Sequence, residues 1–122
     1  MGGKRRVVII DDEPAFAETL NQMVTGLGFD VTVSTDARSS YALALKDADI
    51  VFVDILMPNV TGPQVLQKLA QQKTKASVVL MSGHLERLDE AEKLARKLDL
   101  NLIGALEKPF RLEDVKDVLL ST

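Results

Sequence analysis

The chain has 122 residues, of which 46% are hydrophobic and 27% are charged, and this fits one ordinary globular domain. Its 15 Lys and Arg against 18 Asp and Glu give a net charge of −3, which argues against direct nucleic-acid binding. There is no cysteine, which excludes disulfides and thiolate metal sites and favours the cytoplasm, and no apolar run approaches the roughly 20 residues of a membrane span.

The first part of the chain predicts a strand, a helix and a second strand. Residues 7–10, Val-Val-Ile-Ile, form a short apolar run that is typical of a buried strand. A helix follows, with Pro14 in its first turn and with Gly26 and Gly28 at its end. The apolar residues that recur at helical spacing are Phe16, Leu20, Met23, Val24 and Leu27. Residues 29–34 then predict the second strand.

The middle of the chain continues this alternation. An alanine-rich helix is predicted over about 37–46, followed by a third strand at 50–53 that is apolar at every position. Residues 58–62, Pro-Asn-Val-Thr-Gly, predict a loop. A helix follows the loop and leads to a fourth strand at 78–81. The apolar residues that mark this helix are Val65, Leu66 and Leu69.

The last part of the chain predicts a helix, a fifth strand at 100–106 and a final helix. The apolar stripes of these helices are Leu88, Ala91, Leu94, Ala95 and Leu98, and then Leu112, Val115, Val118 and Leu119. Strands that are apolar on both faces, each followed by a helix, predict a parallel sheet covered on both sides. Five such units are too few for an eight-unit barrel, so we expect an open three-layer α/β sandwich. It would form one domain over residues 1–122, with an ordered core at about 5–121.

Polar side chains follow four of the five predicted strands. They are Asp11, Asp12 and Glu13 after the first strand, Asp54 after the third, Ser82 and Gly83 after the fourth, and Glu107, Lys108 and Pro109 after the fifth. In open α/β sheets, functional groups gather at the carboxyl ends of the strands, near the point where the strand order reverses. We therefore expect carboxylates, a hydroxyl and an ammonium to meet in one site.

The residue types at this edge suit phosphoryl transfer. Adjacent carboxylates repel one another, and a hard cation such as Mg²⁺, which proteins hold through carboxylates, waters and phosphate oxygens, removes that repulsion. Asp54 is placed to attack phosphorus and form an aspartyl-phosphate. The metal and Lys108 would neutralise charge on the transferring group, and Ser82 and the N–H of Gly83 would hydrogen-bond its oxygens.

Each of these residues, taken alone, also has a purely structural explanation. The acids at 11–13 suit the positive end of a helix dipole, and Ser82 suits a helix cap. Asp54 suits a turn ahead of Met-Pro-Asn, and Lys108 suits a surface position before a proline. The combination in chain order favours a site over these separate explanations.

Together the motifs resemble the receiver domains of bacterial two-component response regulators. The motifs are Asp-Asp-Glu at 11–13, Asp-Ile-Leu-Met-Pro-Asn-Val-Thr-Gly at 54–62, Met-Ser-Gly at 81–83 and Glu-Lys-Pro-Phe at 107–110. The resemblance covers essentially the whole chain and implies a flavodoxin-like fold with strand order 2-1-3-4-5. It implies a signalling domain rather than an enzyme, one that assists its own phosphotransfer and dephosphorylation.

The resemblance implies a metal site next to a phosphorylation site. Asp54 would accept the phosphoryl group from a sensor histidine kinase or a histidine phosphotransfer protein. Mg²⁺, with Mn²⁺ as the alternative ion, would be bound by Asp12 directly and by Asp11 partly through water. Asp54 and the backbone carbonyl of Leu56 would complete the protein ligands.

The remaining site residues are also assigned by the resemblance. Ser82 and Gly83 would contact the phosphoryl group, and Lys108 would pair with it. The Lys108–Pro109 bond is expected to be cis and so to orient Lys108. His84, two residues after Ser82, would influence the access of water, although an exposed loop histidine is the simpler reading. Phosphorylation adds roughly 1.5 to 2 negative charges, and the domain would then shift between two states.

The sequence departs from the family pattern on the fifth strand. Many receivers carry Tyr or Phe three residues before the lysine, and here that position is Ala105. The only tyrosine, Tyr41, falls in the predicted helix at 37–46. The usual rotation of an aromatic ring therefore has no residue to perform it, and we expect any signal to pass through backbone shifts of the fourth helix.

The output is not encoded in these motifs. The stretch from Asn101 to Leu112 is similar to receivers that precede EAL-type cyclic-di-GMP phosphodiesterase domains. This similarity would make the chain a fragment that acts on an output domain or a partner.

Three other functions are alternatives to a phosphorylated receiver. A haloacid-dehalogenase-type phosphohydrolase would need a second Asp at position 56, where Leu56 stands. No phosphate-binding glycine motif supports a nucleotide-binding module. A phosphorylation-independent docking module stays the main alternative, and both a monomer and a homodimer are open.

Overall fold

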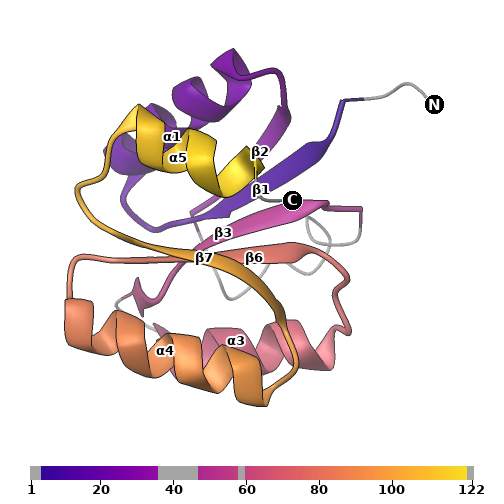
Figure 1. Ribbon diagram of the computed structural model, residues 1–122, viewed down its shortest axis with the longest axis vertical. Helices are drawn as coiled ribbons and strands as arrows, with labels where there is room; N and C mark the ends of the chain where they lie inside the picture. The colour runs from indigo at the N-terminus through magenta and orange to yellow at the C-terminus, as the bar shows by residue number, and fades with distance from the viewer. Residues whose placement is uncertain (1–3, 36–46, 58–59, 121–122) are drawn as a thin grey trace.

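The computed structural model describes residues 4–35, 47–57 and 60–120 (Figure 1). The strands are β1 (Arg6–Ile10), β2 (Asp30–Ser34), β3 (Ile50–Asp54), β4 (Leu56–Met57), β5 (Val60–Thr61), β6 (Ser77–Ser82) and β7 (Asn101–Glu107). The helices are α1 (Pro14–Gly26), α3 (Gly62–Gln71), α4 (Leu85–Lys97) and α5 (Leu112–Leu120). All five predicted strands are present, with small shifts at their ends. The helix predicted over about 37–46 lies outside the described residues.

The five longer strands form one parallel sheet. Its order is β2-β1-β3-β6-β7, which is 2-1-3-4-5 when only these five strands are numbered. The predicted flavodoxin-like order is therefore confirmed. The order reverses between β1 and β3, which are hydrogen-bonded neighbours with Val8 opposite Val51. The crevice of such a sheet opens at this reversal, beyond the carboxyl ends of the two strands.

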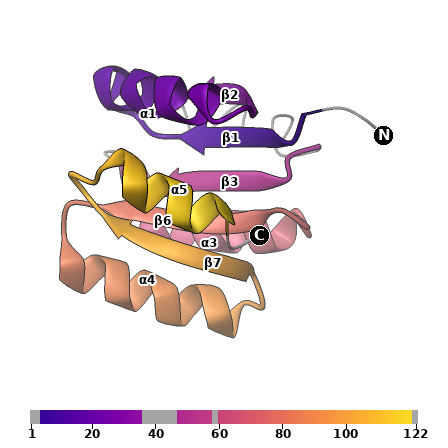
Figure 2. The same ribbon diagram turned by 45° about the horizontal axis from the view of Figure 1, so that its top comes forward.

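Helices cover both faces of the sheet. Figures 1 and 2 show α1 and α5 on one face and α3 and α4 on the other. Successive residues of a strand point to opposite faces, so Ile50 and Phe52 of β3 pack in the core beneath α1 and α5, and Val51 and Val53 pack in the core beneath α3 and α4. All four side chains are buried. This two-sided burial explains why the strand is apolar at every position, and the predicted three-layer sandwich is confirmed.

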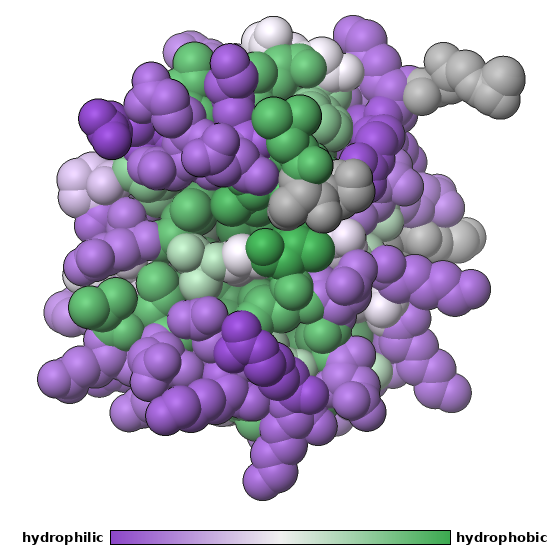
Figure 3. Space-filling model, viewed as in Figure 1, coloured by the Kyte–Doolittle hydropathy of each residue, from purple (hydrophilic) through white to green (hydrophobic). Residues whose placement is uncertain are grey.

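The strand β7 forms one edge of the sheet. Figure 3 shows the surface on the side of β7, where a band of apolar side chains crosses the middle, between α4 and α5. Leu102, Ile103 and Ala105 of β7 are half-buried, which places them between the core and this surface. None of the helices within the described ranges is long and apolar enough to cross a membrane.

The segment after β3 differs from the sequence prediction. A loop was expected over 58–62, but Val60 and Thr61 form β5, which pairs with β4 in a two-stranded antiparallel sheet. The helix α3 already begins at Gly62. Thr61 caps this helix: its hydroxyl accepts a hydrogen bond from the Gln64 N–H, and its own N–H donates to the Gln64 side chain. The prediction of a continuous loop was therefore wrong for residues 60–62.

Gly62 is required by a close backbone approach. A Cβ atom at this position would lie 3.0 Å from the Ile55 carbonyl oxygen and 3.2 Å from the Ile55 Cβ. We predict that Gly62→Ala lowers the free energy of unfolding by about 1–3 kcal/mol, because the backbone at Ile55 has to shift. Urea unfolding followed by circular dichroism at 222 nm measures this.

The matched control for that prediction is Gly26→Ala, at the end of α1. A Cβ atom at Gly26 meets nothing within 4 Å. This substitution is expected to leave stability unchanged or to raise it by about 0.5–1 kcal/mol, because it removes the freedom of a helical glycine in the unfolded chain. Equal losses of stability in both variants would contradict the role given to the Gly62 contact.

Candidate functional site

The carboxyl ends of four parallel strands bring the predicted site residues together. Asp11 follows β1, Asp54 ends β3, Ser82 ends β6 and Lys108 follows β7. The ladder between β6 and β7 places Ser82 opposite Glu107, and the Lys108 N–H donates to the Ser82 carbonyl oxygen at 2.8 Å. The parallel sheet thus holds the backbone of each site residue in a hydrogen-bonded frame.

Three carboxylates form a compact cluster at this edge. Asp11, Asp12 and Asp54 each offer one oxygen, and these three oxygens lie within 4.8 Å of one another. Asp11 is 0% exposed and Asp54 is 3% exposed, while Asp12 is half-buried. Because buried carboxylates are costly without a cation, and because oxygen ligands at this spacing suit a hard divalent ion, the donor set fits Mg²⁺.

The two buried carboxylates are each fixed by a backbone N–H. The Glu13 N–H donates to Asp11 Oδ1 at 2.9 Å, and the Leu56 N–H donates to Asp54 Oδ1 at 3.0 Å. In both cases the donor lies two residues after the acid, so the chain turns back on its own side chain. The other oxygen of each carboxylate is left to face the site.

Lys108 joins these oxygens through its ammonium. Nζ lies 2.8 Å from Asp11 Oδ2, 3.1 Å from Glu13 Oε1 and 3.3 Å from Asp54 Oδ2. The Lys108 side chain is 12% exposed, whereas the Glu13 side chain is 65% exposed. Two of the three pairs are thus largely removed from solvent, where their attraction is screened less than at the surface.

Burial shifts the pKa of Asp54. Desolvation raises the pKa of Asp54 from 3.8 to about 6, and it outweighs the hydrogen bond from Leu56 and the charge of Lys108, which both lower it. For Lys108, burial on its own lowers the pKa, but the hydrogen bond to Asp11 and the charges of Asp54 and Asp11 together raise it above the ordinary value. Lys108 is therefore a permanent cation in this site.

Ser82, Gly83 and His84 form the wall next to β6. The Ser82 side chain is fully buried, and its Oγ accepts a hydrogen bond from the His84 N–H at 3.0 Å. His84, rather than Ser82, is the residue that precedes the first turn of α4, so the helix-cap reading of Ser82 does not hold. Gly83 and His84 are exposed and line the same cavity as Asp54 and Lys108.

An open cavity of about 370 Å³ lies over this cluster. Its lining residues are Glu13, Phe16, Asp54, Leu56, Gly83, His84, Lys108 and Pro109. The Lys108–Pro109 peptide bond is cis, as the sequence resemblance implied. The Leu56 side chain is 41% exposed at the rim of this cavity.

Two lining residues had no role in the sequence prediction. In the sequence Glu13 is only one of three adjacent acids, whereas the structure pairs it with Lys108. The sequence places Phe16 in the apolar stripe of its helix, but its ring lies under the Lys108 ammonium. Its place in the first turn after the acids is the one sequence signal that could have indicated this contact.

Ala105, which stands where the family pattern would place an aromatic residue, is half-buried against the core beneath α3 and α4. Tyr41 lies outside the described residues.

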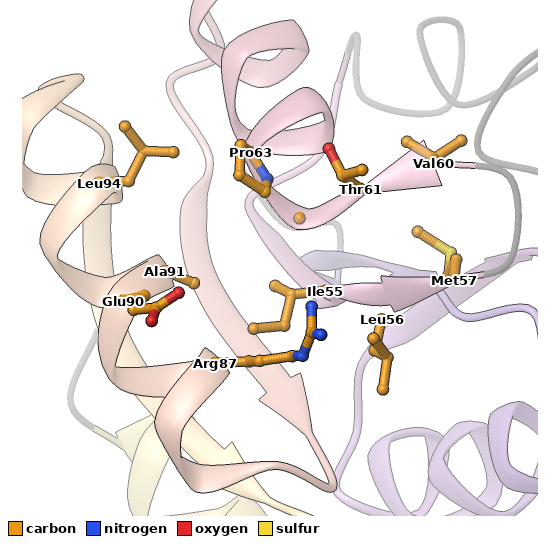
Figure 4. Close-up of a pocket in the computed structure, with 11 residues that line it drawn as sticks. Ile55, Leu56, Met57, Val60, Thr61, Pro63, Arg87, Glu90, Ala91 and Leu94 are labelled. Carbon is orange, nitrogen blue, oxygen red and sulfur yellow. The ribbon is translucent and has the colours of Figure 1, made fainter.

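A second hollow lies beside the cavity, between α4 and the segment 55–57. Figure 4 shows its mostly apolar lining and the Arg87 side chain reaching from α4 toward this segment. Leu56 lines both hollows. The backbone that links Asp54 to α3 therefore separates the carboxylate cluster from this second, less polar space.

Comparisons with known proteins agree on one family. The family model described as the response regulator receiver domain matches residues 7–120. The positive alginate biosynthesis regulatory protein of Pseudomonas aeruginosa is 34% identical over 117 residues, which cover 93% of this chain and 45% of that protein. The transcriptional regulatory protein FixJ of Bradyrhizobium diazoefficiens is 29% identical over 111 residues, which cover 90% of this chain and 52% of that protein.

Solved structures show the same likeness. The crystal structure of a response regulator from Colwellia psychrerythraea matches with a TM-score of 0.84 at 33% identity, over 98% of this chain and 96% of that chain. By contrast, the chain spans about half the length of the curated relatives it matches. The likeness therefore concerns one domain of those relatives.

Proposed function

Because the chain belongs to the response regulator receiver domain family, we propose that it accepts a phosphoryl group on Asp54 in a Mg²⁺-dependent reaction and then switches conformation. The observation that carries this proposal is the contact of Lys108 Nζ with both Asp54 and Asp11, two buried carboxylates from different strands. A buried acid beside a fixed cation at the edge of a parallel sheet suits nucleophilic attack on phosphorus.

Mg²⁺ is the ion that the donor set fits best, with Mn²⁺ as the alternative. Asp11, Asp12 and Asp54 would hold it, with the backbone carbonyl of Leu56 as a further ligand. When bound, such an ion supplies positive charge to the phosphoryl oxygens and to the acids around it. The protein's part is to hold these carboxylates close together and partly shielded from water.

The transfer itself uses one carboxylate oxygen of Asp54. That oxygen attacks phosphorus and forms a P–O bond to Asp54. The bond between phosphorus and the donor breaks, and the donor keeps the electron pair of that bond. With a phosphohistidine donor the broken bond is P–N, and the imidazole takes up a proton. The Lys108 ammonium lies 3.3 Å from Asp54 Oδ2 and can hydrogen-bond the oxygens of the transferred group. We assign the same role to the Ser82 hydroxyl, at the end of the neighbouring strand β6.

The partners belong to the same proposal. The phosphoryl donor would be a sensor histidine kinase or a histidine phosphotransfer protein. The signal would then pass to an output domain or to a separate protein. The relatives named above are regulators of transcription and of alginate biosynthesis, so gene regulation stands beside the expected cyclic-di-GMP phosphodiesterase as an output. A cytoplasmic location and the choice between monomer and homodimer stay predictions.

The matched family is a signalling domain and not a family of enzymes. Any assistance that the chain gives to its own phosphotransfer and dephosphorylation is part of the proposal. His84 lines the cavity at the exposed end, and we assign it an influence on the access of water to the phosphoryl group. The competing proposal is a docking module that works without phosphorylation, and it makes no use of the buried Asp54–Lys108 pair.

The proposal is tested by intact-mass measurement after incubation with Mg²⁺ and acetyl phosphate. We expect a gain of one phosphoryl group, labile to hydroxylamine as an acyl phosphate is, and no gain when EDTA replaces the metal. No gain from acetyl phosphate or from a phosphorylated phosphotransfer protein, with Mg²⁺ binding confirmed by titration, would contradict phosphoryl acceptance and favour the docking module.

A further inference from the structure

The ring of Phe16 lies against the ammonium of Lys108. Nζ is 4.0 Å from the ring centroid and over the ring, a distance at which a cation is attracted by the π electrons. Phe16 is in the first turn of α1 and lines the same cavity as Asp54. The ring therefore borders the place where a phosphoryl group would reach the site.

Contacts other than Lys108 set the orientation of this ring. Phe110 meets it edge to face, with ring centroids 5.4 Å apart and an interplanar angle of 84°. Both rings also pack against the core beneath α1 and α5. Phe16 is thus held by apolar contacts with Phe110 and with the core, and it presents its face to the ammonium.

The acidic partners of the ammonium differ in exposure, so these partners alone do not fix its position. Asp11 and Asp54 are buried, but the Glu13 side chain is 65% exposed and can draw Nζ outward. A lysine side chain has four rotatable bonds and is costly to hold in one place. An aromatic face attracts the cation without a hydrogen-bond acceptor, so it leaves the three N–H donors of Lys108 to oxygen atoms.

We propose that Phe16 is a positioning residue whose ring holds the Lys108 ammonium beside Asp54, so that its N–H groups are in place for the incoming phosphoryl oxygens. This inference rests on the proposed function. Leucine at this position would keep an apolar side chain of α1 but would remove the aromatic face. Tyrosine would keep the face, and its added hydroxyl would reach solvent because Phe16 is only half-buried.

The first test observes the contact itself and needs no phosphorylation. Protons over an aromatic ring resonate upfield, so the Hε protons of Lys108 should be shifted upfield in the wild type and in Phe16→Tyr. In Phe16→Leu they should return to the ordinary lysine position. The resonance is assigned by its absence from Lys108→Met. An ordinary shift in the wild type would overturn the inference.

The second test measures the rate of phosphorylation by acetyl phosphate at saturating Mg²⁺. Phe16→Leu should lower the maximal rate about 3- to 10-fold, the size expected for loss of a partly desolvated cation–π contact, and Phe16→Tyr should restore most of it. The donor concentration for half-maximal rate should change little, because Phe16 acts on Lys108 and not on donor binding. Phe29→Leu, the same change against the same core but away from the cavity, is the matched control and should keep the wild-type rate.

A double-mutant cycle separates positioning from a general structural role. In the Lys108→Met background, Phe16→Leu should cause no further loss, because the residue through which it acts is gone. An equal loss in both backgrounds, or an unchanged rate in Phe16→Leu, would overturn the inference while leaving phosphoryl acceptance intact. If the wild type takes no phosphoryl group, the proposed function fails, and the role in phosphoryl acceptance fails with it.

Discussion

Asp54→Asn is expected to make the metal-free protein more stable at neutral pH. The wild-type carboxylate is 3% exposed, and burial raises its pKa from 3.8 to about 6. A rise of this size means that ionising Asp54 costs about 3 kcal/mol more in the folded protein than in the unfolded chain. Asparagine has nearly the shape of the protonated acid and carries no charge, so it should recover most of that free energy above pH 6.

The pH dependence follows from the direction of the shift. Because the folded pKa lies above the unfolded value, the unfolded chain loses its proton near pH 4 while the folded protein keeps its proton until about pH 6. Wild-type stability due to Asp54 is thus fully present below about pH 4 and falls by about 1.4 kcal/mol per pH unit up to about pH 6. The advantage of Asp54→Asn should be absent at pH 4 and complete at pH 7.

Urea unfolding in EDTA at pH 4, 5 and 7, followed by circular dichroism, measures this difference. Asp12→Asn, a change in the same cluster at a half-buried carboxylate, should have a smaller effect. Adding Mg²⁺ should reduce or reverse the advantage, because the wild type binds the ion more tightly and gains stability by mass action. An advantage that is the same at every pH would show that the charge of Asp54 is not its cause.

Lys108→Met should destabilise the metal-free protein strongly. The substitution keeps much of the apolar stem but leaves Asp11, which is 0% exposed, and Asp54 without their cation. Breaking a buried pair by removing one partner typically costs about 3–5 kcal/mol, because a buried charge is left unpaired. The single change with the largest expected loss is therefore in the site and not in the apolar core.

The loss should depend on the charges that remain. Asp54→Asn combined with Lys108→Met should be more stable than Lys108→Met alone, since one of the two unpaired buried charges is gone. Millimolar Mg²⁺ should also restore much of the stability, because a divalent ion can replace the ammonium. Lys108→Arg, which keeps the charge, is the control and should lose less. Full stability of Lys108→Met in EDTA would refute the pairing as a source of stability.

The sheet was predictable because its strands are buried on both faces. Four consecutive apolar residues at 7–10 and at 50–53 leave no solvent-facing position, and a parallel sheet with helices on both sides meets that requirement. The pairing of β4 with β5 was not predictable, because strands of two residues have no period to detect. Gly62 and the Thr61 cap, which begin α3, were absorbed into a predicted loop.

The site was predictable as a set of residues but not as a network. Parallel strands bring their carboxyl ends to one edge, so Asp11, Asp54 and Lys108 had to be neighbours. Which oxygens Lys108 reaches depends on the turn after Asp11 and on the packing of the first turn of α1. Phe16 shows the limit most clearly, because an apolar residue at helical spacing looks the same whether it faces the core or a cation.

The most direct measurement compares the intact masses of the wild type and Asp54→Asn after the same incubation with Mg²⁺ and acetyl phosphate. Both proteins keep Asp11, Asp12 and Lys108, so the comparison isolates the carboxylate that we propose as the acceptor. We expect one phosphoryl group on the wild type, released by hydroxylamine, and none on Asp54→Asn. An equal gain on both proteins would place the phosphoryl group on another residue and would contradict phosphoryl acceptance by Asp54.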